Sequence, residues 1–257
     1  MVGGRWSGMD WGGGYIDSMF RSLLKSISDR VPSQCAVCHA WPAHAVCEAC
    51  TVRFAQPQPR CRTCALPVPA GLDRCGACIR IPTGLDACLA AVTYAYPWSR
   101  LIVEFKFRAR PGWASSFATL LRSTPWVEPA LEGARFVVPM PLSAERLRAR
   151  GFNQALELSR QLAPGKTEYG LLLRIRDTAA QSGLPRAQRL RNVRHAFAIE
   201  PVRAGLLAGA NVVLLDDVMT SGASMYAAAG ALRSAGATQI TGIVLARADL
   251  HADDAQT

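Results

Sequence analysis

The sequence predicts an α/β protein in which a mostly parallel, Rossmann-like sheet follows a small cysteine-rich module. From about Leu85 onward, short apolar runs alternate with helical patterns, which is typical of strand–helix–strand units and a parallel sheet. Before that point, eight of the nine cysteines come in four Cys-x-x-Cys pairs, which indicates metal sites. The 257 residues suffice for one well-buried domain and a small accessory one.

Residues 1–31 are expected to form a tail with a short helix whose apolar face carries Phe20, Leu23, Leu24 and Ile27. This region shows neither the apolar core nor the cleavage site of a secretory signal. No segment reaches the roughly 18 apolar residues that a membrane span requires. We therefore expect a cytoplasmic protein without a membrane span.

Residues 32–84 are expected to form a double zinc ribbon. The two-residue gap lets both sulfurs of a pair face one ion, and two pairs complete a tetrahedral thiolate site. This segment is poor in large aliphatic residues, so zinc would supply the folding free energy that a core cannot. Sequential pairing and an interleaved cross-brace use the same residues, although the short loops favour the sequential form. The expected ligands of two structural zinc ions are Cys35, Cys38, Cys47, Cys50, Cys61, Cys64, Cys75 and Cys78. Cys88 stands alone and is expected to be a buried thiol.

Residues 85–250 are expected to form the α/β domain, with a C-terminal tail at 251–257. Apolar periodicity predicts strands at 90–96, 195–199, 212–215 and 240–246, and a strand that runs into a loop over 136–143. It predicts helices over 101–108, 113–121 and 146–162, and one through Met225, Ala228 and Leu232. Ligands of parallel sheets bind at the carboxyl ends of the strands. Ser143 and Asp216 should both emerge at that edge.

A sugar-phosphate site is indicated where the strand at 212–215 ends. Asp216 and Asp217 follow the apolar run, and a loop rich in hydroxyl groups then opens a helix. Free N–H groups at a helix start bind phosphate, and carboxylates can accept hydrogen bonds from ribose hydroxyls. Capping a helix requires only one Asp, Ser, Thr or Gly residue. Several of these residues follow one another here in a fixed order, which favours a ligand site. The loop residues are Thr220, Ser221, Gly222, Ala223 and Ser224.

The formal net charge of +10 suggests an anionic partner. Two zinc–thiolate sites would lower it to about +6. Arginines gather at 146–150 and 186–194, where they could bind a polyphosphate or nucleic acid, or form a solvated face. Lys106 stands between Phe105 and Phe107. It could face pyrophosphate, or the rings could stack on single-stranded bases, although core packing is the expected use of both rings.

In combination, these motifs resemble the ComF (competence protein F, also GntX-like) family. The resemblance rests on the four cysteine pairs, Phe-Lys-Phe-Arg at 105–108, Val-Pro-Met-Pro-Leu-Ser at 138–143, the segment 145–154, Arg-Asp-Thr at 176–178, the segment 189–192 and the run from Asp216. That run also resembles the phosphoribosyl pyrophosphate (PRPP) motif of type I phosphoribosyltransferases. The resemblance implies a type I phosphoribosyltransferase fold with a hood over its substrate.

The same resemblance implies roles for individual residues. Asp216 and Asp217 would hold the ribose and Mg²⁺, residues 220–224 the 5-phosphate, and the backbone of Pro141, Leu142 and Ser143 the pyrophosphate. The hood at 174–194 would bring Arg176, Arg189 or Arg191 to the leaving group, with Lys106 as a further cation. A solvated helix or a loop that clamps nucleic acid remains the alternative for this segment.

Two functions are therefore expected. One is a PRPP- and Mg²⁺-binding protein that transfers the phosphoribosyl group to an unidentified acceptor. The alternative is a non-catalytic factor that binds single-stranded DNA on the same fold. By resemblance, competence or DNA-processing proteins would be its partners.

Overall fold

The computed structural model describes residues 33–41, 43–107, 111–176 and 196–249. The chain forms two compact units, Met1–Glu48 and Ala49–Thr257. The expected N-terminal helix, most of the expected hood and both tails lie outside the described residues. The expected borders at residues 31, 84 and 250 stay predictions.

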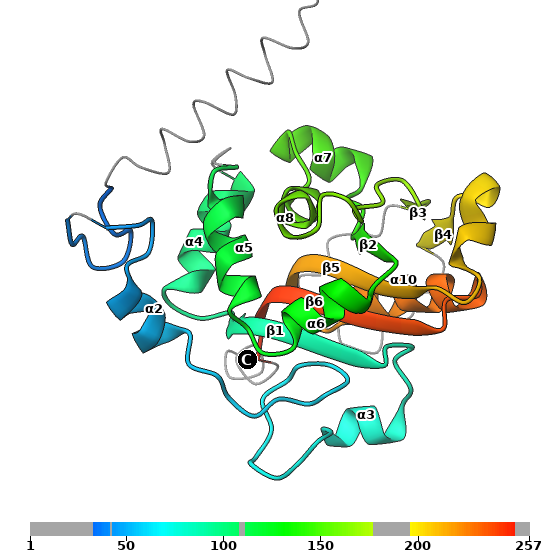
Figure 1. Ribbon diagram of the computed structural model, residues 1–257, viewed down its shortest axis with the longest axis horizontal. Helices are drawn as coiled ribbons and strands as arrows, with labels where there is room; N and C mark the ends of the chain where they lie inside the picture. Colours follow the sequence, from blue (N-terminus) through cyan, green and yellow to red (C-terminus); the bar gives the residue numbers. More distant parts are fainter. Residues whose placement is uncertain (1–32, 42, 108–110, 177–195, 250–257) are drawn as a thin grey trace, which may run out of the picture. The chain divides into compact units, whose positions relative to one another are not determined.

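The second unit contains a sheet of four parallel strands in the order β1-β6-β5-β2 (Figure 1). Their bounds are β1 Ala87–Thr93, β2 Phe136–Pro139, β5 Asn211–Met219 and β6 Gln239–Arg247. Because all four run in one direction, their carboxyl ends meet at one edge. The predicted α/β class with a parallel sheet is confirmed.

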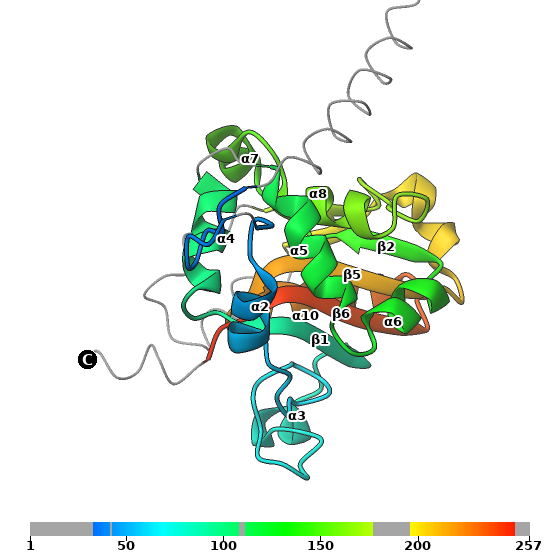
Figure 2. The ribbon, with the colours of Figure 1, turned by 60° about the vertical axis from the view of Figure 1, so that its left-hand side comes forward.

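Helices α4 (Trp98–Phe107), α5 (Trp113–Arg122) and α8 (Gln154–Leu162) lie on one side of this sheet (Figures 1 and 2). The long helix α10 (Ala223–Ser234) packs into a core with Val212 and Leu214 of β5. Val213 and Leu215 alternate with these residues and are equally buried, so the sheet is covered on both faces.

The expected helix over 146–162 is wrong, because two helices occupy that segment. α7 (Ala144–Arg150) ends at Gly151, whose φ of 78° is left-handed and favours glycine. Asn153 then caps α8 through its side-chain oxygen, which accepts from the Ala155 and Leu156 N–H groups.

Several boundaries also differ from prediction. β1 begins and ends three residues earlier than expected, and β5 continues to Met219 because Asp216, Val218 and Met219 still pair with β6. The acid pair therefore lies inside the strand rather than after it.

The other elements of the described residues are α2 Glu48–Phe54, α3 Gly76–Arg80, α6 Val127–Gly133, the 3₁₀ helix η1 Pro201–Leu207 and an antiparallel pair of short strands, β3 Leu172–Arg174 and β4 Phe197–Ile199. Within the described ranges, no helix has the length and apolar character needed to cross a bilayer.

Candidate ligand-binding site and cysteine clusters

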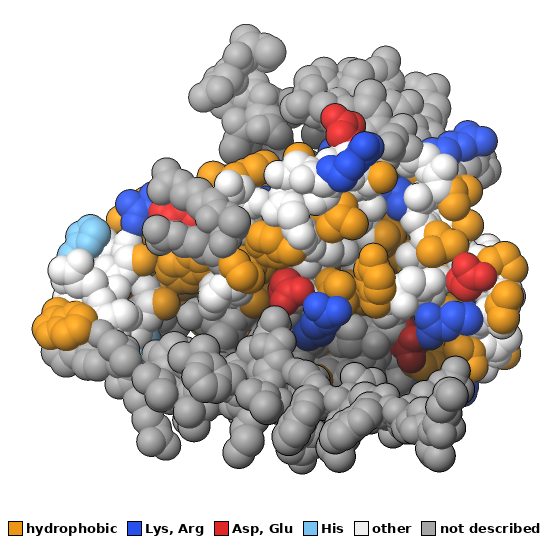
Figure 3. Space-filling view, turned by 90° about the horizontal axis from the view of Figure 1, so that it is seen from above, with side chains coloured by type: hydrophobic (Ala, Val, Ile, Leu, Met, Phe, Trp, Pro, Cys, Tyr) orange, Lys and Arg blue, Asp and Glu red, His pale blue; other side chains and the backbone are white. Residues whose placement is uncertain are grey.

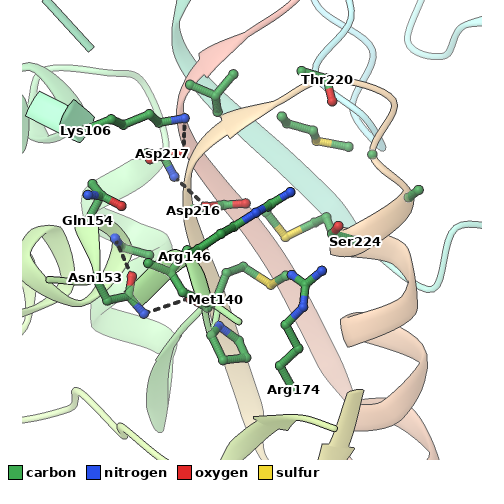
Figure 4. A pocket seen from close by; sticks show the side chains of 18 of the residues that line it. Lys106, Met140, Arg146, Asn153, Gln154, Arg174, Asp216, Asp217, Thr220 and Ser224 are labelled. Carbon is green, nitrogen blue, oxygen red and sulfur yellow. Dashed lines mark hydrogen bonds and ion pairs between the residues drawn. The ribbon is translucent and has the colours of Figure 1, made fainter. Parts of the chain in front are cut away.

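A cavity of about 420 Å³ lies at the carboxyl ends of β2 and β5 (Figure 4). Its volume is typical of small-molecule sites. The wall combines the loop after β2, the end of β5, the start of α10 and side chains from α4, α7, α8 and β3. Four cations, Lys106, Arg146, Arg150 and Arg174, face two carboxylates, so the lining carries net positive charge.

Most of the residues predicted from sequence meet in this cavity. The ten that line it are Lys106, Pro141, Leu142, Asp216, Asp217, Thr220, Ser221, Gly222, Ala223 and Ser224. Ser143 is buried outside the lining, and its hydroxyl accepts a hydrogen bond from the Arg146 N–H (3.2 Å) at the start of α7. Arg176 is exposed and outside the lining. Arg189 lies outside the described residues.

Sequence reasoning did not assign five polar lining residues to the site. Arg146, Arg150, Asn153 and Gln154 all belong to the segment 145–154 quoted for the family resemblance, which was the available signal. Arg174 lies on β3, a strand that sequence periodicity did not predict. It is the first residue of the expected hood at 174–194, but no role in the site was assigned to it.

The two carboxylates face the same cavity although neighbouring residues of a strand alternate between faces. The Asp216 carboxylate bends along the backbone and accepts a hydrogen bond from the Asp217 N–H (2.8 Å). The Asp217 carboxylate lies 2.9 Å from Lys106 Nζ. Figure 4 shows both side chains beside the cavity that Arg146 enters from the opposite wall.

The electrostatic environment of Asp216 differs from that of an exposed acid. Burial, and then the neighbouring charge of Asp217, raise the pKa of Asp216 to about 7, while Lys106 and Arg150 oppose this shift. The group therefore gains or loses a proton near neutral pH. A bound cation would favour its charged form.

The loop after β5 and the first residues of α10 line the cavity. Gly222 adopts a left-handed φ of 81°. A Cβ there would lie 2.5 Å from Tyr226 Cζ and 2.6 Å from Met219 Cε. Glycine is thus required both by conformation and by close packing.

The three hydroxyl groups of this loop have different environments. Ser221 is buried, and its Oγ accepts a hydrogen bond from the Ala223 N–H (3.4 Å). Thr220 is exposed and Ser224 is half-buried, and Figure 4 shows both at the cavity. The latter two are therefore the hydroxyl groups available to a ligand.

The opposite wall is held by Asn153 and Gln154. Besides capping α8, Asn153 donates from Nδ2 to the Met140 carbonyl (3.0 Å), which ties the loop after β2 to the helix. Gln154 Oε1 accepts from Arg150 Nη1 (3.0 Å). Its Nε2 is buried and, among the described residues, has no hydrogen-bond partner. Because such a donor is costly to bury, Gln154 is suited to donate to a ligand.

The two rings beside Lys106 have different uses. Phe105 is buried and packs edge-on to Phe117, which confirms the expected core role. Phe107 is 65% exposed, with the Arg150 guanidinium 5.1 Å from its ring centroid. The expectation that both rings pack in the core is wrong for Phe107.

The cysteine pairs form two clusters, each with all four sulfurs within 4.8 Å of one another. Cys35, Cys38, Cys47 and Cys50 make the first, and Cys61, Cys64, Cys75 and Cys78 the second. Sulfur–sulfur distances of 3.6 Å between Cys38 and Cys47 and between Cys64 and Cys75 fit the edge of a tetrahedron with Zn–S bonds of about 2.3 Å. Both clusters could hold structural zinc, and the pairing is sequential.

Backbone donors stabilise the thiolate of one cysteine in each cluster, whereas burial raises the pKa of Cys64 to about 11 and also raises that of Cys78. The N–H groups of Val37 and Cys47 lie 3.4 and 3.3 Å from Cys35 Sγ. Although burial acts in the opposite direction, such hydrogen bonds lower the pKa of Cys35 to about 6, and of Cys61 to about 7. Zinc binds the thiolate. The lone Cys88 is buried, and burial raises its pKa to about 12, which confirms the expected structural thiol.

The parallel sheet, the loop at its carboxyl edge and the two Cys₄ clusters define a protein with a phosphoribosyltransferase-like fold and a double zinc ribbon. Sequence comparison agrees: the "DNA utilization protein YhgH" of Salmonella typhimurium is 30% identical over 220 residues, 82% of this chain and 95% of that protein. The chain belongs to the ComF family.

Two further relatives carry names from natural competence. "Competence protein F" of Haemophilus influenzae is 29% identical over 198 residues, 74% of this chain and 85% of its own. "Competence protein ComFC" of Bacillus subtilis is 28% identical over 230 residues, 88% of this chain and 82% of its own. No protein-family model matches the chain.

Proposed function

We propose that the cavity binds PRPP together with Mg²⁺ and that the protein transfers the phosphoribosyl group to an acceptor nucleophile. The observation that carries this proposal is the meeting of Asp216 and Asp217 with the loop 220–224 in one cavity. A sugar phosphate needs hydroxyl acceptors and phosphate donors within one small volume. The net positive lining suits its pyrophosphate.

In this proposal the loop binds the 5-phosphate. The residues at the start of α10 line the cavity directly after the left-handed Gly222, and the dipole of this helix favours an anion there. Thr220 and Ser224 add hydroxyl donors. Gln154 donates its buried Nε2 hydrogens to the ligand.

The carboxylates bind the ribose. Asp216 and Asp217 accept hydrogen bonds from the ribose hydroxyls and provide the hard oxygen ligands that suit Mg²⁺. When bound, Mg²⁺ neutralises charge on the departing pyrophosphate. Arg146 and Arg150 face the pyrophosphate from the opposite wall.

Transfer displaces pyrophosphate from ribose C1. The C1–O bond breaks with its electron pair on pyrophosphate, and a bond from the acceptor to C1 forms. The transition state resembles an oxocarbenium ion, so the cationic wall stabilises the departing polyanion rather than the sugar. The arrangement favours departure of pyrophosphate before the acceptor bond is complete.

The test is calorimetric titration of zinc-loaded protein with PRPP, with and without Mg²⁺. We expect Mg²⁺-dependent binding that is lost in the Asp216→Asn/Asp217→Asn double variant. Asp73→Asn is the matched control, because Asp73 is exposed and outside the cavity lining. Absence of binding to folded wild-type protein would refute the proposal. If PRPP binds, the protein is then mixed with PRPP and each of a panel of nucleobases, and the pyrophosphate released is measured to test phosphoribosyl transfer.

A second candidate function is binding of single-stranded DNA in the cytoplasm, in concert with competence or DNA-processing proteins. The exposed Phe107 under Arg150 favours it, since aromatic and guanidinium planes stack on bases. The names of the relatives point the same way. Among the side chains coloured in Figure 3, basic groups are scattered between acidic and hydrophobic ones, so this candidate rests on Phe107 rather than on a basic stripe.

Salt and substitution separate the two functions. DNA binding through phosphates should weaken steeply with salt and survive Asp216→Asn, but should fall in Phe107→Ala. PRPP binding should depend on Mg²⁺ and survive Phe107→Ala. Fluorescence anisotropy with a labelled oligonucleotide at two salt concentrations measures DNA binding and its dependence on salt.

A further inference from the structure

Arg247, the last residue of β6, is fully buried and bonded entirely to backbone carbonyls. Its Nε donates to the Cys64 carbonyl (2.8 Å) in the second cysteine cluster. Its Nη1 donates to the Met219 carbonyl (2.8 Å) and to that of Thr220. One guanidinium therefore joins Cys64 of the second cysteine cluster to the end of β5 and to the start of the ligand loop, which is the loop of residues 220–224.

The buried charge of Arg247 has no carboxylate among its described hydrogen-bond acceptors. The further acceptor is the Ala248 carbonyl, and within the described chain Nη2 has no partner. A buried cation is costly without a compensating charge. Four thiolates around one Zn²⁺ carry a net charge of about −2. The second cluster can supply this charge, because the carbonyl of its ligand Cys64 accepts directly from Arg247.

The second cluster is also part of the core beneath the loop. Cys61, Cys64 and Cys78 belong to the same buried cluster as Met219, and Tyr226 packs against it. Tyr226 in turn closes the space beside Gly222. Of the described residues, none from the first cysteine cluster belongs to this core.

We infer that Arg247 is a positioning residue that couples metal loading of the second cysteine cluster to the shape of the ligand loop. With zinc bound, the guanidinium stays buried and holds the Met219 and Thr220 carbonyls. Without zinc, the uncompensated charge leaves this position and releases them. The use of this loop by PRPP rests on the proposed function, but the coupling itself does not.

Hydrogen exchange of the full-length, ligand-free protein tests the coupling. Cys75→Ser removes one ligand from the second cluster, and Cys47→Ser is its counterpart in the first, with similar exposure. We expect exchange in peptides covering 219–226 to rise about tenfold or more in Cys75→Ser and to stay unchanged in Cys47→Ser. Peptides covering β2 report global unfolding. Equal exchange of the loop in both variants would overturn the inference.

Arg247→Lys keeps the charge but offers a single donor atom in place of the guanidinium fork. We expect it to retain zinc and to show the same loop exchange as Cys75→Ser, with no additional increase when the two are combined. Full additivity would contradict the coupling. Global unfolding of both Arg247→Lys and Cys75→Ser, with Cys47→Ser still folded, would also contradict the coupling. That result would show that Arg247 and the second cluster stabilise the whole protein rather than the loop.

PRPP titration of the same variants is a separate measurement. If wild-type protein does not bind PRPP, the proposed function fails while the exchange result still decides the coupling. If it binds, Cys75→Ser should weaken binding about tenfold or more and Cys47→Ser should not.

Discussion

Lys106 Nζ on α4 lies 2.9 Å from Asp217 Oδ1 on β5, and the two side chains are only 15% and 8% exposed. Because of this ion pair, the neighbouring acids Asp216 and Asp217 differ in how their negative charges are compensated. The charge of Asp217 is matched by a cation, whereas Asp216 accepts a hydrogen bond from the Asp217 N–H and has a raised pKa. Substitutions at the two positions should therefore have opposite effects on the unliganded protein.

Asp217→Asn should destabilise the protein by about 3 kcal/mol, because it leaves the Lys106 ammonium largely buried without its carboxylate. Chemical denaturation measures the change in unfolding free energy. The double variant with Lys106→Met should recover part of the loss. A single variant as stable as wild type would show that the pair is not needed for stability.

Asp216→Asn should change how stability depends on pH. Because the pKa of Asp216 is raised to about 7 in the folded state, the folded protein holds a proton that the unfolded chain releases at lower pH. Stability from this group is thus fully present in acid and is lost as pH rises through about 7. Relative to wild type, the melting temperature of Asp216→Asn should rise between pH 5 and pH 8. A constant difference across this range would contradict the raised pKa.

Gly222→Ala should weaken PRPP binding about tenfold or more, because alanine is strained at a left-handed φ and its methyl group displaces Tyr226 and Met219. Gly230→Ala is the matched control in the same helix. Gly230 has an ordinary φ and open space where a methyl group would stand, so alanine there should stabilise the helix by about 1 kcal/mol. Titration and thermal melting of both proteins make the comparison.

Asn153→Ala should weaken ligand binding, whereas Ser143→Ala should reduce only the stability of the protein. Both substitutions remove a helix N-cap, worth about 1 kcal/mol. Only Asn153 also bonds the Met140 carbonyl in the cavity wall, so its loss should additionally weaken ligand binding. Equal binding by the two variants would show that this tie does not position the wall.

Metal analysis should find close to two zinc ions per chain, one for each cysteine cluster. Cys47→Ser and Cys75→Ser should each lose about one. Cys88→Ala should lose none, because Cys88 is a buried thiol that belongs to neither cluster. Zinc-free protein with intact thiols would contradict the assignment.

Much of the site could be predicted because its signals are local. The Cys-x-x-Cys spacing already limits which sulfurs can share an ion, and the run from Asp216 to Ser224 contains both carboxylates and the hydroxyl-rich loop that line the cavity. Parallel strands then bring this run beside Pro141 and Leu142 without further information.

Other features could not be predicted from local patterns. Neighbouring residues of a strand point to opposite faces, yet Asp216 and Asp217 both line the cavity, and the Asp216 carboxylate accepts a hydrogen bond from the Asp217 N–H. The helix break at Gly151 is different, because the glycine and the capping Asn153 are local signals, but the apolar periodicity over 146–162 continues across both helices and conceals them.

The sequence by itself determines the fold class, the order of the motifs and the cysteines able to bind metal, because these follow from spacing and side-chain chemistry. Which charges meet depends on the tertiary structure alone. Lys106 reaches Asp217, and Arg247 reaches Cys64 and Met219, across long stretches of chain. Burial makes such pairings decisive, since a charge removed from water must find its partner wherever the packing of the sheet and helices places it.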